Sequence, residues 1–319
     1  MKITVIRLSH AGDMAHAIPF IRALKSSIDC KIVWVIEEKF FPVVKYESSV
    51  DRFFILKGKK GLRRFIFSRG LKSDIVIDLQ GLLKSGIIAY KIIAEEKIGF
   101  ADARECAWIF YTRKISPPAR IHVIDRNLFI LKSYFNIKPE KISTELITGV
   151  REDKEAKILI AQAPDRINVF FNPVAGWKNK SIPLDVCIKI INYFKNNKKF
   201  NLWINATGEN IKIFSEFATG NIFIFKNLPL NLLIAIIKRM NLAIGPDTGP
   251  IHFASMCNIP TIGIYGPTDP ARNGPYGKNS VIIYKNLTCS PCWRRNCNEP
   301  ECMNISLEDI IEGMKKLGF

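Results

Sequence analysis

The stretch KITVIRLSHAGD, residues 2–13, opens the chain with a run of β-branched and apolar residues that ends in a short polar turn. A helical pattern of apolar residues follows from Met14 to about Lys25. A buried strand, a glycine-bearing turn and a helix, in that order, predict the first unit of an α/β domain that binds a nucleotide or a sugar. Such domains bind ligands where the strand ends, which places a site at residues 9–13.

Beyond this unit, strands and helices alternate along the rest of the chain. Val- and Ile-rich strands in alternation with helices predict parallel sheets that are covered on both faces. The alternation restarts at Asn168, after a charged helical stretch that ends at Ile160, so we expect two successive domains. The further strands expected are Lys31–Ile36, Phe53–Leu56, Asp74–Leu79, Asn168–Phe171, Asn201–Asn205, Ile222–Phe225, Leu242–Gly245 and Thr261–Tyr265.

The chain is strongly basic, with 47 Lys and Arg against 29 Asp and Glu and a net charge of +18. Residues 1–150 hold 26 cations and 15 acids, and residues 151–319 hold 21 and 14. Positive charge is most concentrated between Asp51 and Lys72. This segment has two interpretations, a solvated loop or a surface that attracts anionic lipid, nucleic acid or an acidic substrate. Its eight cations are Arg52, Lys57, Lys59, Lys60, Arg63, Arg64, Arg69 and Lys72.

No export signal or membrane-spanning segment is predicted. Arg7 interrupts the first apolar run, and the apolar stretch 228–237 is stopped by two cations, short of the ~20 residues that span a bilayer. We therefore expect a cytoplasmic protein, in which the eight cysteines are thiols or metal ligands rather than disulfides. Two alternatives are open for four closely spaced cysteines, a compact zinc site or structural thiols. They are Cys289, Cys292, Cys297 and Cys302.

Polar residues follow several predicted strands, and each group has a functional and a structural interpretation. Asp13 is either an ordinary N-cap of the first helix or a general base that faces a cleft. The segment AGWKNK, residues 175–180, is a strand-to-helix turn whose glycine and two lysines suit a phosphate group. It is not a Walker A loop, and no G-x-G-x-x-G motif occurs in the chain, which weakens a dinucleotide-dehydrogenase function.

GPDTGPIH, residues 245–252, is the most informative motif, because a strand ends there and a helix with His252 in its first turn follows. The Thr248 hydroxyl, the backbone N–H groups and the helix dipole suit a pyrophosphate, while Asp247 could cap the helix or bind sugar hydroxyls. Glu209, after another strand, suits the two hydroxyls of a ribose. An ordinary cap followed by a core histidine is the alternative, but it leaves the crowding of polar groups unexplained.

Together these residues resemble the lipopolysaccharide heptosyltransferases, glycosyltransferase family 9. The similarity is carried by MKITVIRLSHAGDMAHAIPFIRAL (1–24), NPVAGWKNKSIP (172–183) and GPDTGPIHFASMCNIPTIGIYGPTDPARNGPYG (245–277). Residues 78–90, 98–105 and 110–114 are most similar to the heptosyltransferase I branch, which adds the first heptose to the Kdo sugars of lipid A. The resemblance implies a GT-B fold, two Rossmann-like domains with mainly parallel sheets that face a central cleft. Residues 1–160 would form the acceptor domain, and residues 161–319 the nucleotide-sugar domain with a C-terminal helix.

The resemblance also implies an inverting, metal-independent transfer of L-glycero-D-manno-heptose from ADP-heptose, with no cofactor beyond that donor. Asp13 would deprotonate the attacking hydroxyl, and Lys180 would neutralise the departing pyrophosphate. Glu209 would bind the ribose, Asp247 the heptose, and Leu228 would lie against the adenine. The residues implied in donor binding are Val174, Ala175, Glu209, Leu228, Asp247, Thr248, Gly249 and His252.

The implied acceptor is an anionic glycolipid, Kdo-lipid A, at the cytoplasmic face of the inner membrane. Cations near such a surface contribute roughly 1 kcal/mol each, so the basic segment would hold the enzyme there without a spanning helix. Nucleic acid is not an implied partner. The residues implied in acceptor binding are Ser9, Gly12, Arg63, Arg64, Lys84, Arg104, Arg113 and Arg120.

Two other functions stay open. The cysteine-rich segment CSPCWRR, residues 289–295, is more similar to heptosyltransferase II, so a family 9 transferase with another donor or acceptor is one alternative. A basic protein that binds nucleic acid and carries a four-cysteine metal site is the other, although it leaves the phosphate-type turns without a use.

Overall fold

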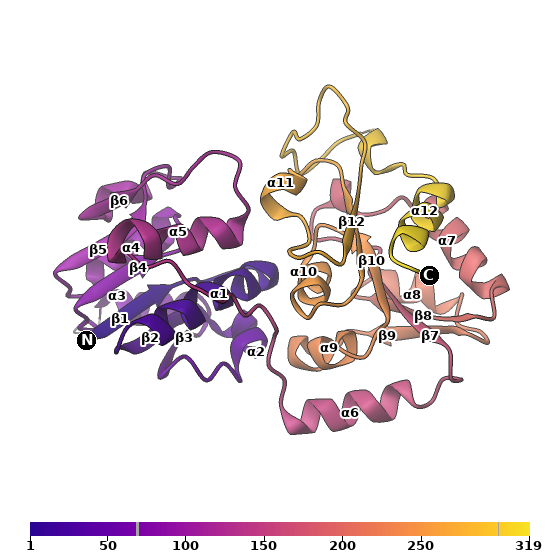
Figure 1. The fold of residues 1–319 in the computed structure, drawn as a ribbon, viewed down its shortest axis with the longest axis horizontal. Helices are drawn as coiled ribbons and strands as arrows, with labels where there is room; N and C mark the ends of the chain where they lie inside the picture. Colours follow the sequence, from indigo (N-terminus) through magenta and orange to yellow (C-terminus); the bar gives the residue numbers. More distant parts are fainter. Residues whose placement is uncertain (68–69, 299) are drawn as a thin grey trace. The chain divides into compact units, whose positions relative to one another are not determined.

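A computed structural model describes residues 1–67, 70–298 and 300–319; of the eight clustered cations, Arg69 and the side chain of Lys59 lie outside the described part. The chain forms two compact units, Met1–Ile147 and Thr148–Phe319 (Figure 1). The division falls before helix α6 (Val150–Ile160) rather than after it, because α6 packs against α9 (Leu230–Ile237) of the second unit. A hydrogen bond of 2.5 Å from Asn231 on α9 to Glu152 on α6 adds to that packing.

The first unit is built on a six-stranded sheet in the order β3-β2-β1-β4-β5-β6, with parallel pairing throughout. Its central strands are buried on both faces, which explains their continuous Val and Ile runs. The strands are β1 (Lys2–Ile6), β2 (Lys31–Glu37), β3 (Arg52–Leu56), β4 (Ile75–Asp78), β5 (Glu96–Phe100) and β6 (Arg113–Ile115).

Helices cover both faces of this sheet. Phe65 of α3 and Ile88 of α4 belong to one core cluster with strand residues such as Val35 and Val76. Helices α1 and α5 pack against each other and do not take part in that cluster. The helices are α1 (Ala11–Ser27), α2 (Phe41–Val44), α3 (Gly58–Phe67), α4 (Leu83–Lys91) and α5 (Val123–Phe135), with the short 3-10 helices η1 (Glu38–Phe40) and η2 (Ala107–Phe110).

The second unit repeats the plan, with the parallel order β12-β11-β10-β7-β8-β9. Counted from the first strand of each unit, the two sheets have the same order, and it is that of nucleotide-binding α/β domains. The strands are β7 (Ile167–Phe171), β8 (Phe200–Ala206), β9 (Ile222–Lys226), β10 (Leu242–Pro246), β11 (Thr261–Tyr265) and β12 (Ser280–Tyr284).

Alternate residues of the second sheet serve different core regions, as the twofold period of a strand requires. Val169 and Phe171 of β7 join a cluster with helices α7 and α12, whereas the intervening Phe170 is buried outside that cluster. The remaining elements are α7 (Leu184–Asn196), α8 (Asn210–Ser215), α10 (Gly249–Met256), α11 (Pro270–Asn273), α12 (Leu307–Lys316), η3 (Lys178–Lys180) and η4 (Glu301–Met303).

Each sheet has one topological switch point, where the chain changes direction across the sheet. It lies between β1 and β4 in the first unit and between β7 and β10 in the second. In parallel sheets of this kind the loops that leave the two strands diverge there, which opens a crevice at the carboxyl edge for a ligand. The turns singled out in the sequence, residues 9–13 and 245–252, leave the strands of these two switch points.

The predicted fold class and the C-terminal helix are confirmed, and all the predicted strands are present. Strands β5, β6 and β12 were not predicted, because β5 begins with charged residues, β6 has three residues and β12 is only partly buried. The basic segment is not a loop: most of it forms helix α3, whose Phe65 is buried in the core. Among the described residues, no helix has the length and apolar character needed to cross a membrane.

Candidate active site

Asp13 lies in the first turn of α1, the helix that follows β1, at the switch point of the first sheet. The helix N-cap is His10, so the alternative that Asp13 is the N-cap is wrong. His10 has a backbone φ of 69°, a conformation that favours glycine, and such strain concentrates at functional sites. Ser9 is half-buried beside it, and Gly12 is buried within the turn.

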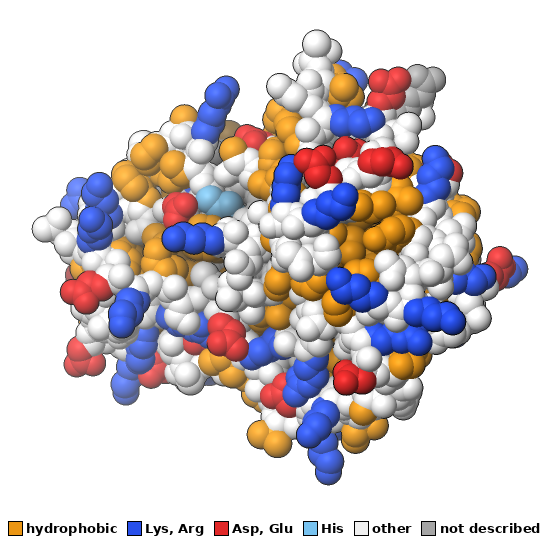
Figure 2. All heavy atoms as spheres, turned by 45° about the vertical axis from the view of Figure 1, so that its right-hand side comes forward, with side chains coloured by type: hydrophobic (Ala, Val, Ile, Leu, Met, Phe, Trp, Pro, Cys, Tyr) orange, Lys and Arg blue, Asp and Glu red, His pale blue; other side chains and the backbone are white. Residues whose placement is uncertain are grey.

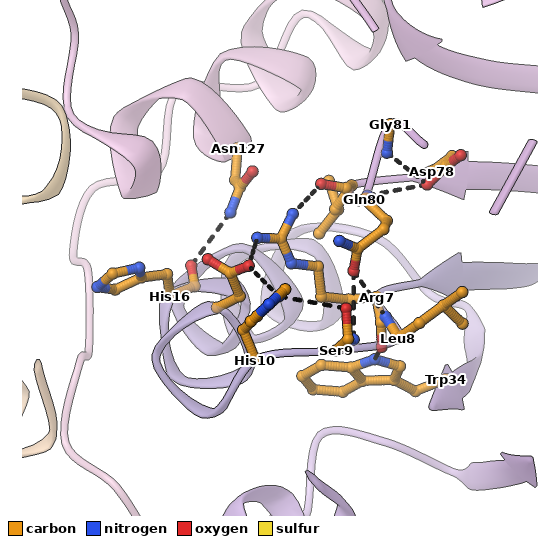
Figure 3. A network of polar contacts seen from close by, with 12 residues as sticks. Arg7, Leu8, Ser9, His10, His16, Trp34, Asp78, Gln80, Gly81 and Asn127 are labelled. Carbon is orange, nitrogen blue, oxygen red and sulfur yellow. Dashed lines mark hydrogen bonds and ion pairs between the residues drawn. The ribbon is translucent and has the colours of Figure 1, made fainter. Parts of the chain in front are cut away.

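An arginine holds the Asp13 carboxylate in place. The Nη2 of Arg7 lies 2.6 Å from Oδ2 of Asp13, and its Nη1 donates to the carbonyl of Leu79 in the loop after β4 (Figure 3). The Arg7 side chain is only 9% exposed, whereas that of Asp13 is 31% exposed. Nδ1 of His10 lies 3.6 Å from the same carboxylate oxygen. Arg7 therefore holds one side of the Asp13 carboxylate, while the Asp13 side chain stays partly exposed to solvent.

Gln80, which follows β4, ties the two loops of this switch point together. Its Oε1 accepts hydrogen bonds from the backbone N–H groups of Leu8 and Ser9, at 3.1 and 3.3 Å (Figure 3). Asp78, the last residue of β4, accepts in turn from the N–H groups of Gln80 and Gly81, at 2.8 and 3.1 Å. This network fixes the backbone on which Arg7 and Asp13 are carried.

Asp78 is fully buried, and burial raises the pKa of its carboxyl group, against the opposing effect of its hydrogen bonds. The hydroxyl of Tyr111 donates to it at 2.7 Å, and burial together with the Asp78 charge raises the pKa of Tyr111. The ring of Tyr111 lies where a Cβ at Gly99 would be, so this packing requires a glycine there. The hydrogen-bonded pair of Asp78 and Tyr111 therefore fixes the end of β4, one of the two strands of the switch point.

Lys180 is brought to the switch point of the second sheet by the turn that follows β7. Its Nζ donates to Oδ2 of Asp247 at 2.9 Å and lies 4.9 Å from the centroid of the Trp177 ring. The ammonium group has three N–H donors, and the bond to Asp247 takes one of them. Lys180 is thus held in position with donors left for an anionic ligand.

Asp247 follows β10 and is enclosed by two partners. Besides Lys180, its Oδ1 lies 2.9 Å from Nε2 of His252, and both the Asp247 and His252 side chains are 6% exposed. Burial alone would raise the pKa of Asp247, but His252 and Lys180 outweigh burial and hold the pKa well below its usual range. Asp247 is therefore a fixed negative charge rather than a helix cap, since Thr248 is the N-cap of α10.

Thr248 is held by a short chain of amides that crosses the neighbouring strands. Nδ2 of Asn205 on β8 donates to Oδ1 of Asn172 at 2.8 Å, and Nδ2 of Asn172 donates to Oγ1 of Thr248 at 3.1 Å. Oγ1 of Thr248 donates to the carbonyl of Pro246 at 3.1 Å. The hydroxyl and the first N–H groups of α10, which starts at Gly249, therefore share one strand end.

The remaining candidate donor residues leave neighbouring strands of the same sheet. Val174 and Ala175 are half-buried in the turn after β7, the exposed Glu209 follows β8, and the half-buried Leu228 follows β9. Because β10, β7, β8 and β9 are adjacent and parallel, all their carboxyl ends lie on one edge. The structure therefore places all eight candidate donor residues along that edge.

The candidate acceptor cations are less closely grouped. Arg63 and Arg64 are exposed on α3, Lys84 pairs with Glu37 at the end of β2, and the exposed Arg104 donates its backbone N–H to Gly81. Arg120 lies in the loop after β6, at the same edge as Asp13. Arg113 does not join them: it begins β6, at the opposite edge of the sheet, 3.4 Å from Glu96. Figure 2 shows Lys and Arg side chains spread over the visible face.

The four clustered cysteines are free thiols, of which Cys302 is buried and Cys289 and Cys297 are exposed. Burial, and then the charges of Cys292, Cys289 and Cys297, raise the pKa of the Cys302 thiol. Over residues 1–67, 70–298 and 300–319, no three His, Cys, Asp or Glu side chains are arranged to hold a metal ion. The zinc and structural-thiol alternatives for these four cysteines both stay predictions.

Arg7, Gln80 and Asn172 were not among the site residues predicted from the sequence. A cation at the end of a strand that is otherwise apolar was the available signal for Arg7, since unpaired charges are rarely buried. Gln80 and Asn172 each follow a buried strand, where a polar side chain points to a ligand edge.

Comparison with known proteins agrees with this arrangement. The family model for glycosyltransferase family 9 (heptosyltransferase) matches residues 64–303. A lipopolysaccharide heptosyltransferase 1 from Campylobacter coli is 30% identical over 344 aligned positions, with 99% of each chain covered.

Two solved structures share the fold. The glycosyltransferase family 9 protein from Veillonella parvula DSM 2008 has a TM-score of 0.83 at 22% identity, covering 99% of this chain and 96% of its own. The E. coli heptosyltransferase WaaC with ADP has a TM-score of 0.76 at 20% identity, with 100% of both chains covered. The chain therefore belongs to glycosyltransferase family 9, the heptosyltransferases, and is a glycosyltransferase.

Proposed function

We propose that the protein transfers L-glycero-D-manno-heptose from ADP-heptose to a Kdo sugar of lipid A, in synthesis of the lipopolysaccharide inner core at the cytoplasmic face of the inner membrane. The single observation that carries the proposal is the pair of switch points. One presents a partly exposed carboxylate anchored by Arg7, and the other presents a lysine and a helix N-terminus anchored by Asp247 and Asn172. The names of the family relatives support heptose as the sugar and ADP as the nucleotide.

In this mechanism, Asp13 takes the proton of the attacking Kdo hydroxyl, and the oxygen forms a bond to the anomeric carbon of the heptose. The bond from that carbon to the diphosphate breaks from the opposite side, so the anomeric configuration inverts and ADP leaves with the electron pair. The main electrostatic demand is the charge that develops on the diphosphate. Lys180 and the N-terminus of α10 supply positive charge there, and the Thr248 hydroxyl can donate to the diphosphate once its proton turns away from the Pro246 carbonyl.

Four further donor residues have distinct roles in this mechanism. Glu209 binds the ribose hydroxyls, and Leu228 lies against the adenine. Asp247 accepts hydrogen bonds from the heptose while it keeps Lys180 in place, and His252 supports Asp247. On the acceptor side, Arg63, Arg64, Lys84, Arg104 and Arg120 would face the Kdo carboxylates and lipid A phosphates. Arg113, at the opposite edge of the sheet, does not belong to this group.

The deciding experiment incubates the protein with ADP-heptose and Kdo-lipid A, with and without EDTA, and measures the mass of the acceptor. A mass gain of one heptose supports the proposal, and its persistence in EDTA supports transfer without a divalent ion. No gain with this pair, together with transfer from another nucleotide sugar, would refute the donor assignment.

A heptosyltransferase II activity is the second candidate, favoured by the cysteine-rich segment at residues 289–295. It is tested in the same assay with an acceptor that already carries one heptose. Preferential transfer to that acceptor would replace Kdo by heptose as the site of attachment.

A further inference from the structure

The outer surface of the layer formed by α3, α4 and η2 exposes more large apolar side chains than the helices α1 and α5 do. Among its described residues, the first unit exposes nine large apolar side chains, and six of them lie in or directly after these elements. Over their described length, α1 and α5 contribute none of the nine. The six are Phe67, Leu83, Tyr90, Ile93, Trp108 and Ile109, with exposures of 85%, 42%, 61%, 58%, 40% and 55%.

These side chains belong to one continuous layer. Phe65 of α3 and Ile88, Ala89 and Ile92 in and after α4 share one core cluster, so both helices cover the same face of the sheet. Helix α4 also packs on η2, where the rings of Tyr90 and Phe110 lie 5.8 Å apart. The elements are neighbours, and their outward side chains therefore form one surface.

Cations are interleaved with the exposed rings. Nζ of Lys114 lies 4.7 Å from the centroid of Trp108, and Nζ of Lys97 lies 5.3 Å from that of Tyr90. Lys97 is level with Thr112 across the β5–β6 pair, so Lys97 and Lys114 lie two residues apart on one side of the sheet. Helix α3 adds exposed Lys60, Arg63 and Arg64 to this layer.

Exposed Trp and Tyr rings beside Lys and Arg are the side chains that favour the boundary between lipid headgroups and acyl chains. Helix α3 buries an apolar side against the core and turns a basic side outward, which is typical of a helix at an anionic membrane surface. We propose that the outer surface of the α3–α4–η2 layer docks the enzyme on an anionic phospholipid membrane. The proposal relies on the proposed function only for its expectation of a lipid-linked acceptor.

The test measures co-sedimentation of the full chain with vesicles of phosphatidylglycerol and phosphatidylcholine, and with vesicles of phosphatidylcholine alone. The wild-type chain binds the anionic vesicles, more weakly as salt increases. Trp108→Ala/Ile109→Ser weakens that binding roughly tenfold through lost apolar contact. Lys60→Gln/Lys114→Gln weakens it by about fivefold for each charge removed.

The matched control is Val150→Ser/Ile158→Ser on α6 of the second unit, whose side chains are 87% and 56% exposed. It removes similar apolar area, and vesicle binding stays at the wild-type level. Equal loss in the control, unchanged binding in both layer variants, or a wild-type chain that binds neither vesicle would each overturn the proposal. Circular dichroism checks that every variant is folded.

Transfer to an acceptor dispersed in detergent separates this proposal from the proposed function. Trp108→Ala/Ile109→Ser keeps its turnover there, because the surface acts only in membrane attachment. A wild-type chain that binds anionic vesicles but transfers no heptose in detergent would refute the proposed function without contradicting the docking surface. Loss of detergent activity in this variant would show that the two residues act in the site, against the docking proposal.

Discussion

Asp13 and Asp247 each follow a central strand at a topological switch point, Asp13 in the first turn of α1 and Asp247 immediately after β10, yet their surroundings differ. The Asp13 side chain is 31% exposed and is paired on one side by Arg7. That of Asp247 is 6% exposed and lies between Lys180 and His252. A carboxylate that takes up a proton must reach its substrate, whereas one enclosed by two partners keeps its charge. The contrast supports a proton-accepting role for the first and a charge-placing role for the second.

Asp78 extends the comparison, because it is as deeply buried as Asp247 but its pKa moves the other way. Burial raises the pKa of Asp78, whose partners are a tyrosine and backbone N–H groups. The pKa of Asp247 is lowered because its partners are a histidine and a lysine that outweigh burial. The partners, rather than the depth of burial, therefore decide which carboxylate carries a stable charge.

The largest effect is expected at Asp13. Asp13→Asn keeps the size of the side chain but removes the base, so turnover should fall by about 10²–10⁴-fold. ADP binding, which we propose for the second unit, should change little, as measured by calorimetry. Asp29→Asn, the same substitution at an exposed site, serves as the control. Near-normal turnover in Asp13→Asn would remove the base assignment.

Lys180→Ala comes next. Loss of a charge-assisted hydrogen bond of about 1.5–3 kcal/mol should weaken ADP binding by about 10- to 150-fold and lower turnover as well. Lys178→Ala, two residues earlier and exposed, should bind ADP within about twofold of the wild type. If the two variants weaken binding equally, the switch point of the second sheet does not hold the diphosphate.

Arg7 tests whether the anchoring of Asp13 matters in itself. Arg7→Ala frees the carboxylate to move, and displacement of a catalytic group by about 1 Å can cost about 100-fold in rate. We expect kcat to fall while ADP affinity is kept. Arg7→Lys or added guanidinium should restore part of kcat, which a purely structural defect would not allow. Equal loss in Arg7→Lys and Arg7→Ala without guanidinium rescue would contradict an anchoring role.

Two identical substitutions should differ in their effect on the free energy of unfolding. Asp247→Asn leaves Lys180 and His252 without their buried partner and should cost about 3 kcal/mol or more at pH 7. Asp78→Asn removes a charge that burial disfavours and should change stability by less than about 1 kcal/mol. Calorimetric unfolding measures both, and a larger loss in Asp78→Asn would reverse the assignment of the charged carboxylate.

Acid sharpens the same comparison. The Asp247 pKa is lowered on folding, so its stabilisation is present above the ordinary value of 3.8 and is lost as pH falls from there toward the folded pKa. The Asp78 pKa is raised on folding, so its contribution is fully present below 3.8 and declines as pH rises toward its folded pKa. Asp247→Asn should therefore lose less stability than the wild type as pH falls below 3.8. If the free energy of unfolding of Asp247→Asn fell with pH as steeply as that of the wild type, the ion pairs of Asp247 with Lys180 and His252 would not be the source of this stability.

Sequence patterns predicted some residues of the candidate site but not all of them. Asp13, Lys180 and Asp247 were predicted because each follows an apolar run that indicates a strand, and ligands bind where such strands end. The N-cap alternative for Asp13 could not be settled in this way, because the start of α1 at Ala11 depends on the backbone at His10. Arg113 looked equivalent to the other cations, because the three-residue strand β6 was not predicted and nothing in the sequence showed that Arg113 begins a strand.

The sequence by itself determined the alternation of strands and helices, the two domains and the strand ends that carry polar groups, because these follow from local periodicity and turn residues. Only the tertiary structure decided the partners: Arg7 with Asp13 and the loop after β4, and Lys180 with Asp247, 67 residues apart. Those partnerships depend on strand order, which brings β1 beside β4 and β7 beside β10. Local sequence patterns do not predict that strand order, because it is set by how whole helices and strands pack together.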